Sequence, residues 1–273
     1  MLHRNLFGNL LLGPATLVVA LTCTVGTASA QNASAQGCAS LPDYAKLKAA
    51  LVQATKDETS GLNNHMWATI VDRDGVVCAV AFSGKDRFSQ WPGSRVISAQ
   101  KANTANAFGL DSGSNSDGSG QKDGLSLSTA NLFSAVQPGG SLYGLQFSNP
   151  VNEDVGYKIP SASYGTAADP MKGGKIGGVN VFGGGLALFA AGKKMVGGIG
   201  VSGDTSCADH FIAWRLRNNL GLDHLAGVGG ISGDPQRPDN IVFDITNGQS
   251  KGGFGHPSCI NTGNEKMLPA VQP

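Results

Sequence analysis

The sequence is poor in charge and in aromatic residues. Of its 273 residues, 14% are charged and 7% are aromatic, and the chain has 20 basic and 19 acidic residues. Without residues 1–30, which contain Arg4 and no acid, the formal charge is zero. Such a chain lacks the basic excess that binds nucleic acid. Beyond the first 25 residues it also lacks an apolar run long enough to span a bilayer. We therefore expect neither a nucleic-acid partner nor a membrane span.

Several catalytic and binding motifs are absent as well. There is no Cys-x-x-Cys pair, which disfavours a cysteine-ligated metal. The stretch Gly200–Asp204 does not match the Gly-x-Ser-x-Gly of hydrolases, so Ser202 is better explained as a turn-capping residue. The glycine-rich segment 173–185 lacks the Lys-Ser/Thr ending of a phosphate loop. These absences argue against a metal centre, a hydrolase of that class and a nucleotide site.

The N-terminus has the pattern of a signal peptide over residues 1–30. His3 and Arg4 precede an apolar stretch, and the sequence Ala28-Ser29-Ala30 is typical of a cleavage site. A lipoprotein that uses Cys23 is a weaker alternative, because Thr22 stands where a smaller residue is expected. The pattern predicts export to the periplasm or the extracellular space.

Cysteine usage agrees with export. Four cysteines remain after residue 30, an even number that suits an oxidising compartment. Three pairings are possible. We favour Cys38 with Cys78, which would tie the N-terminus to an early strand. We favour Cys207 with Cys259, which would tie the C-terminal tail to the last main helix.

Hydrophobic periodicity predicts helices and hairpins in alternation. We expect a helix capped by Ser40 that runs to about Glu58, and a last helix that begins in a capping box at Ser206. The other expected elements are a hairpin at 66–71 and 76–82, a helix at 94–108, a hairpin at 186–190 and 195–201, and a strand at 240–245. This order suggests a mixed α/β (α+β) sandwich around an antiparallel sheet.

The strand at 195–201 contains Gly197, Gly198 and Gly200. Glycines weaken a strand, since they add no side chain and cost chain entropy. They are tolerated where something flat or bulky lies against the backbone. Either a packed helix or a ligand such as a macrocycle would satisfy this requirement.

Four motifs in this order resemble the GlcG/HbpS haem-binding family, which is related to the C-terminal domain of PduO-type adenosyltransferases. Ala68 to Gly75 matches A-x-x-V-D-x-x-G, and Lys101 to Phe108 matches K-A-x-T-A-x-x-F. Gly184 to Leu188 matches G-G-x-P-x except that Ala187 replaces proline, and Val196 to Gly203 matches V-G-A-I-G-V-S-G. Asp209 matches the acid of the last helix. The resemblance covers about residues 41–220.

The resemblance implies a profilin-like three-layer α/β/α domain, haem or a related tetrapyrrole as ligand, and homo-oligomers. Some family members are implicated in haem-iron release. We place this domain at 31–225, with an irregular insertion at about 110–180. Residues 226–273 form a C-terminal extension packed on the domain. The insertion and the extension depart from the family pattern.

Haem iron needs an axial donor, which is usually histidine. His65, in the loop before the first strand, is the favoured iron ligand, and His210 and His256 are the alternatives. Lys101 and Arg95, with Arg87 before the same helix, are candidate partners for the propionates or for another carboxylate. The leading hypothesis is an exported haem-binding protein for capture, buffering or sensing. A haem-degrading or other small-molecule enzyme, and a non-catalytic interaction module, are the alternatives.

Overall fold

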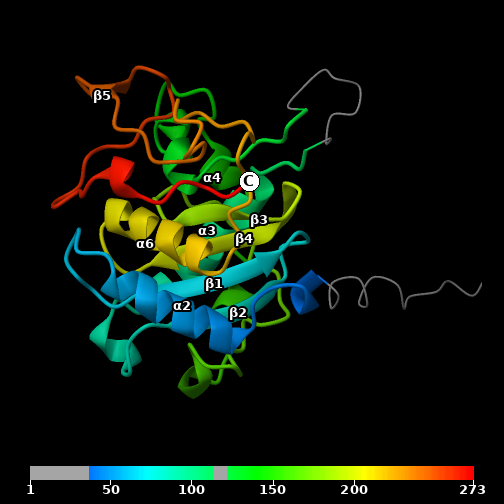
Figure 1. Cartoon of the computed structure of the whole chain (residues 1–273). Coiled ribbons are helices and arrows are strands. Elements are labelled where there is room, and N and C mark those ends of the chain that lie inside the picture. Colours follow the sequence, from blue (N-terminus) through cyan, green and yellow to red (C-terminus); the bar gives the residue numbers. More distant parts are fainter. Residues whose placement is uncertain (1–36, 113–121) are drawn as a thin grey trace, which may run out of the picture.

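The computed structural model describes residues 37–112 and 122–273, and the predicted signal peptide lies outside this part of the chain. Seven elements form the framework (Figure 1): α2 (Tyr44–Lys56), β1 (Trp67–Asp72), β2 (Val77–Phe82), α3 (Ser94–Ala107), β3 (Gly185–Ala190), β4 (Lys194–Ser202) and α6 (Ser206–Asn219). Shorter elements decorate it: α4 (Leu145–Ser148), α5 (Glu153–Gly156), β5 (Ile245–Thr246) and β6 (Gln249–Ser250).

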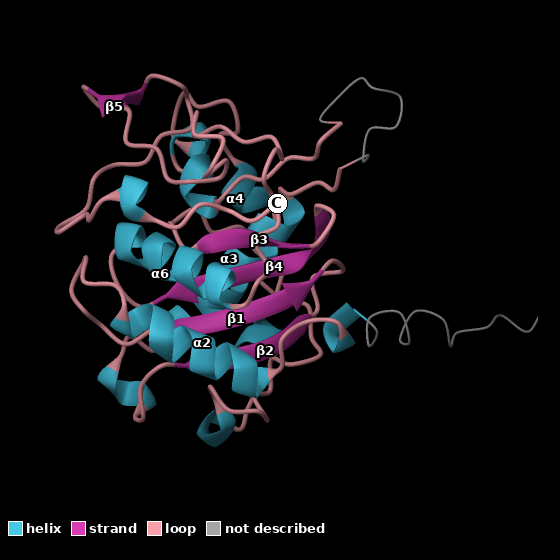
Figure 2. Ribbon diagram, in the orientation of Figure 1, coloured by secondary structure: helices cyan, strands magenta, loops and turns pink. Residues whose placement is uncertain are grey.

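The four long strands form one antiparallel sheet in the order β2-β1-β4-β3. In its register, Ile70 of β1 lies between Ala79 of β2 and Ile199 of β4. Helices α2 and α6 cover one face of the sheet and α3 covers the other (Figure 2). The α/β/α sandwich expected from the sequence is therefore confirmed.

Both faces of the sheet are buried, which explains why β1 and β2 are apolar almost throughout. On β1, Ala68 and Ile70 face the core beneath α2 and α6. Trp67 and Val71 face the core beneath α3. Alternate residues of a strand point to opposite faces, so one strand contributes to two hydrophobic cores.

The glycines of β4 lie against a helix. A Cβ on Gly198 would come 2.2 Å from the carbonyl oxygen of Ala102, and one on Gly200 would come 1.9 Å from that of Ser98. Both carbonyls belong to α3. Of the two explanations open at the sequence level, the packed helix is correct, and α3 occupies the surface that a macrocycle would need. The packing of α3 therefore explains Gly198 and Gly200 without a ligand, and the place where a ligand binds stays a prediction.

Three local predictions are also corrected. The N-cap of α2 is Asp43 and not Ser40. The Asp43 side chain accepts a hydrogen bond from the Lys46 N–H. The cap of α6 is Thr205 and not Ser206. Residues 240–245 form no long strand, because side chains satisfy the backbone there: the Ile241 N–H donates to His210 Nε2 at 3.2 Å.

The C-terminal segment crosses the top of α6 and joins the main core. Leu268 and Val271 are buried among core residues, and the Trp214 indole donates to the carbonyl of Pro269. Both favoured disulfides are present, Cys38–Cys78 and Cys207–Cys259. No helix in the described ranges has the length and apolar character needed to cross a membrane.

Candidate functional site

His65 lies on the surface immediately before β1. Its side chain is exposed, and its ring meets that of Phe82 edge-on at 5.8 Å. Nδ1 lies 3.3 Å from Ser83 Oγ, which also accepts from the Met66 N–H. In the tautomer that donates Nδ1–H to Ser83, the Nε2 lone pair is available to an outside ligand, because it has no partner among the described residues.

A hollow of about 260 Å3 opens beside His65. We call it the His65 hollow. His65 is not itself part of the lining, but its imidazole lies next to two residues that are, Gly84 and Phe82. Its lining comes from α2, the end of β2 and two loops: Tyr44, Lys48, Phe82, Gly84, Lys85, Asp86, Arg87, Ala162, Tyr164, Gly165 and Thr166.

Three cations line the His65 hollow. Lys48 donates to the carbonyls of Phe82 and, at 3.1 Å, Gly84, and burial lowers its pKa from the ordinary value. Lys85 is exposed, and Arg87 is partly exposed. Exposed cations beside an open hollow can pair with the carboxylates of a ligand. Arg87 is a candidate propionate partner from the sequence. Lys48 and Lys85 are not, because nothing in their local pattern brings α2 and the 84–87 loop together.

Arg95 is buried behind the same hollow. Its guanidinium makes a forked pair with Asp169, with Nε 2.9 Å from Oδ2, and donates to the Gly156 carbonyl. It also lies 3.6 Å from the ring centre of Tyr164, which lines the hollow. Arg95 is therefore engaged within the protein and supports one wall of the hollow from behind.

Lys101 is buried between α3 and α6. Its Nζ lies 2.7 Å from Asp209 Oδ2 and donates to the Val201 carbonyl at 3.0 Å. Burial lowers the pKa of Lys101 and raises that of Asp209 to about 6. The structure does not bring Lys101 to the surface beside His65.

A second hollow, of about 290 Å3, opens where α3, α6 and the end of β4 meet. We call it the Ser206 hollow. Gln90 separates it from His65, because its amide donates to the carbonyls of both His65 and Gly203. The lining has apolar walls and a polar floor: Trp91, Ser94, Ile97, Phe182, Ser202, Asp204, Ser206 and Asp209.

The two alternative histidines lie in the interior. His256 is 2% exposed and bonds Ser206, and burial lowers its pKa to about 4. His210 is fully buried beside Asn240, and burial lowers its pKa to about 3. Neither lies with His65. Their role as iron ligands, like that of His65, stays a prediction.

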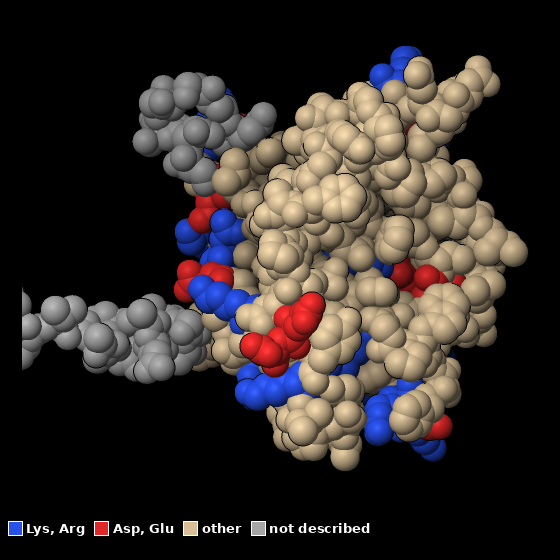
Figure 3. All heavy atoms as spheres, turned by 180° about the vertical axis from the view of Figure 1, so that it is seen from behind, with Lys and Arg blue, Asp and Glu red and all other residues tan. Residues whose placement is uncertain are grey.

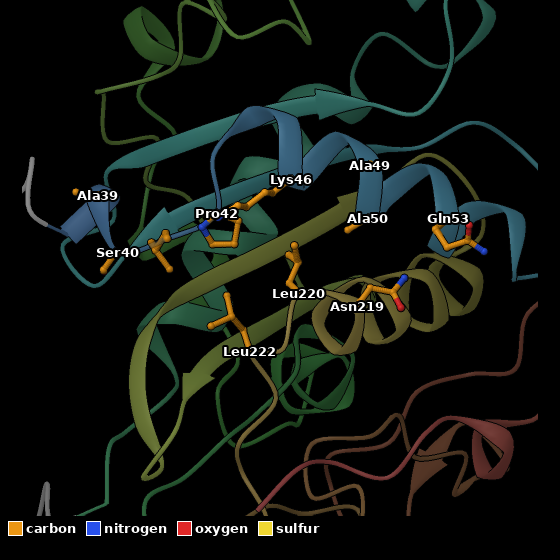
Figure 4. Close-up of a pocket in the computed structure, with 11 residues that line it drawn as sticks. Ala39, Ser40, Pro42, Lys46, Ala49, Ala50, Gln53, Asn219, Leu220 and Leu222 are labelled. Carbon is orange, nitrogen blue, oxygen red and sulfur yellow. The ribbon is translucent and has the colours of Figure 1, made fainter.

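A wider groove of about 720 Å3 runs between α2 and the end of α6 (Figure 4). Small and uncharged residues such as Ala49, Ala50 and Leu220 line it, and Lys46 is the one ionisable residue in its lining. The groove therefore lacks the donors that an iron ligand set or acid–base chemistry requires.

The back of the molecule carries few charged side chains over most of its visible surface (Figure 3). Positive and negative groups lie intermixed where they do gather, mainly along one side and the lower margin. This face presents no broad basic patch of the kind that binds nucleic acid.

A family model, described as haem degrading protein HbpS-like, matches residues 43–216. The chain belongs to the HbpS-like family. The matched region runs from the start of α2 to near the end of α6 and contains both hollows, apart from the contribution of His256. No curated protein matches this chain in sequence.

Three solved structures are similar. A haem complex of PduOC is 24% identical over 64% of this chain and 90% of its own, with a TM-score of 0.41. Protein ORFY of Klebsiella pneumoniae is 23% identical over 77% of this chain and 97% of its own, with a TM-score of 0.39. HbpS is 18% identical over 65% of this chain and 86% of its own, with a TM-score of 0.37.

Proposed function

We propose that this protein is an exported haem-binding protein and that haem binds at the His65 hollow. The observation that carries the proposal is the arrangement at this surface. An exposed imidazole stands beside an aromatic-walled hollow that cations also line. Membership of the HbpS-like family supports haem as the ligand. The two disulfides are compatible with an oxidising compartment outside the cytoplasm.

The residues present fit the group. His65 Nε2 would supply the axial nitrogen, and Ser83 would hold the ring in the required tautomer. Lys85 and Arg87 would pair with propionates, while Tyr164, supported by Arg95, would pack against the macrocycle. When bound, haem would supply an iron centre for ligand exchange and redox chemistry.

The hollow is smaller than a typical drug-sized pocket of about 300–1,000 Å3, so it would hold one edge of a macrocycle. An exposed apolar side chain follows the lining residue Arg87: Phe88 is 71% exposed. A second copy of the chain would cover such a surface, so the expected homo-oligomer belongs to this proposal. Light scattering on the haem-loaded protein should give a mass at least twice that of one chain, and a monomer mass would contradict this part.

Haemin titration of the chain from residue 31, followed in the Soret region, tests the binding. We expect a saturable band with about one haemin per chain. A spectrum that stays that of haemin in buffer at all ratios would overturn the proposal.

The family description favours a second candidate, oxidative haem breakdown at the same site. Adding a reductant together with oxygen or peroxide to the loaded protein separates the two. Loss of the Soret band with release of iron, faster than for free haemin, would indicate an enzyme. A stable band under the same conditions would indicate a binding protein.

A further inference from the structure

We propose that Ser206 and His256 form the nucleophile and base of a second, hydrolytic site that acts on small uncharged esters. This site occupies the Ser206 hollow and is separate from the proposed haem surface. The proposal rests on the geometry of the pair, on the hollow that the serine faces and on the hydrogen-bond donor beside it.

The two side chains are in hydrogen-bond contact. Ser206 Oγ lies 2.7 Å from His256 Nε2, and His256 Nδ1 lies 2.7 Å from the Pro257 carbonyl oxygen. A carbonyl can only accept, so Nδ1 carries the proton and Nε2 accepts from the serine hydroxyl. A serine is activated as a nucleophile when a base accepts its proton and a third group orients that base. Here His256 would be the base and the Pro257 carbonyl the orienting group.

The covalent framework holds this pair in place. Ser206 precedes Cys207, and His256 lies three residues before Cys259, so the Cys207–Cys259 disulfide fixes the two segments against each other. The His256 N–H also donates to the Val242 carbonyl at 2.8 Å. The ring of Phe133 packs against the imidazole at 5.0 Å. Such support limits the motion of the base relative to the nucleophile.

The hollow indicates the substrate class. Trp91, Ile97 and Phe182 form apolar walls, which suit a short acyl chain. Asp204 and Asp209 are also in the lining; Lys101 neutralises Asp209, so Asp204 leaves a net negative charge that disfavours an anionic substrate. A volume of about 290 Å3 leaves room for a small ester and not for a large lipid.

A backbone donor holds the serine hydroxyl in place. The Gly183 N–H donates to Ser206 Oγ at 2.6 Å, at the start of a run of three glycines where a Cβ would collide with the Ser206 carbonyl. With this bond accepted, the hydroxyl proton of Ser206 is directed to His256 Nε2. Ser206 is also the first residue of α6, whose N-terminal N–H groups favour negative charge.

The reaction balances with water as the only co-reactant. Ser206 Oγ bonds to the ester carbonyl carbon as its proton passes to His256 Nε2. The ester C–O bond then breaks, and the leaving alcohol takes that proton. Water next attacks the acyl-serine and gives its proton to His256, and the acid leaves as Ser206 regains a proton. The sum is ester plus water to acid plus alcohol.

The pH dependence of ester hydrolysis distinguishes His256 from an ordinary histidine. Burial lowers the pKa of His256 to about 4, so this base stays neutral well below the range of an ordinary histidine at 6.5. Activity that depends on it should persist below pH 6.5 and fall near pH 4. Hydrolysis by surface histidines would already decline near pH 6.5.

The test uses the disulfide-intact chain with p-nitrophenyl acetate and a fluorophosphonate probe. We expect ester hydrolysis with the profile above and one phosphonyl adduct, located on Ser206 by peptide mass spectrometry. Ser206→Ala should lower kcat/KM by about 10²-fold or more and abolish the adduct. Ser148→Ala is the control, since this exposed serine of α4 bonds the Leu145 carbonyl outside the Ser206 hollow, and it should retain activity within about threefold.

His256→Gln should abolish both hydrolysis and labelling if the imidazole acts as the base. An unlabelled wild-type chain would overturn the proposal, as would a Ser206→Ala variant that hydrolyses the ester at the wild-type rate. Labelling of the wild-type chain shows whether Ser206 is a reactive nucleophile, even if a variant fails to fold. Haemin binding is read separately in the Soret region, so failure of either site is visible on its own.

Discussion

At the scale of single residues, three ion pairs are almost wholly buried: Lys101–Asp209, Arg95–Asp169 and Arg217–Asp239. A buried pair contributes little net stability relative to apolar residues of similar volume, because desolvation offsets the attraction. Removal of one partner is costly, since it leaves an uncompensated charge in the interior. Lys101–Asp209 joins α3 to α6, whereas the other two pairs join these helices to Asp169 and to Asp239 of the long connections.

Asp209→Asn should destabilise the fold by about 3–5 kcal/mol, because Lys101 then lacks its counter-ion. The double variant Lys101→Met with Asp209→Leu should lose less than either single variant alone. Guanidinium unfolding of Asp209→Asn, of the single variants Lys101→Met and Asp209→Leu, and of the double variant measures both effects. A single variant within about 1 kcal/mol of the wild type would contradict the assigned pairing.

Stability should fall as the pH drops from about 6.5 to about 4. Burial holds the pKa of His210 near 3 and that of His256 near 4, against 6.5 for a free histidine. In this window the unfolded chain binds more protons than the folded one, so protonation favours unfolding. Asp209, with a pKa of about 6, acts in the opposite direction and offsets part of the loss.

Urea unfolding at pH 7, 5.5 and 4 measures this slope. Each pKa unit corresponds to about 1.4 kcal/mol, so the two histidines together remove several kcal/mol by pH 4. His210→Gln should flatten the slope, since it removes one buried titrating group. An equal slope in wild type and variant would show that His210 does not titrate in this way.

At the scale of secondary-structure elements, the contact between β4 and α3 decides the fold. Gly198 and Gly200 let the helix backbone approach the strand directly. This close approach also buries the start of α3 deeply enough to enclose Ser98, which bonds Thr69 of β1 at 2.8 Å.

Gly200→Ala should destabilise the protein by about 3 kcal/mol, because the new Cβ would lie 1.9 Å from the Ser98 carbonyl oxygen. Gly93→Ala is the matched control. It caps the same helix with φ −64°, and a Cβ there meets nothing within 4 Å. Thermal unfolding should separate the two variants clearly. Equal loss in both would mean that α3 does not pack on β4 as described.

Much of this framework is predictable from the sequence, because hairpin turns and apolar periodicity are local signals. The partners of buried charges are not local. Asp169 lies 74 residues from Arg95, and Asp209 lies 108 from Lys101. The sequence therefore predicts that Arg95 and Lys101 of α3 contact a ligand. In the fold their partners are carboxylates of the protein itself. The Ser206–His256 contact spans 50 residues and likewise has no local pattern.

At the scale of the whole molecule, the C-terminal segment is integral to the structure. It completes the core around α6 and brings His256 to Ser206. Two disulfides tie the ends of the described chain to the sheet and to α6, which suits a glycine-rich protein with long irregular connections.

Replacing Cys207 and Cys259 together by Ala should lower the free energy of unfolding by about 4 kcal/mol, from the entropy of a loop of 52 residues. Guanidinium unfolding without reductant measures the change. Thiol titration of the denatured, unreduced wild type from residue 31 should find no free thiol. Two or more free thiols, or a loss below about 1 kcal/mol, would contradict the role given to this bridge.

The proposed function depends above all on haem binding beside His65. The most direct measurement is the Soret spectrum of haemin-loaded His65→Ala set beside that of His224→Ala, whose imidazole bonds the Pro273 carbonyl away from the hollow. We predict a shifted band and weaker binding for His65→Ala, and a wild-type spectrum for His224→Ala. An unchanged spectrum in His65→Ala would contradict the claim.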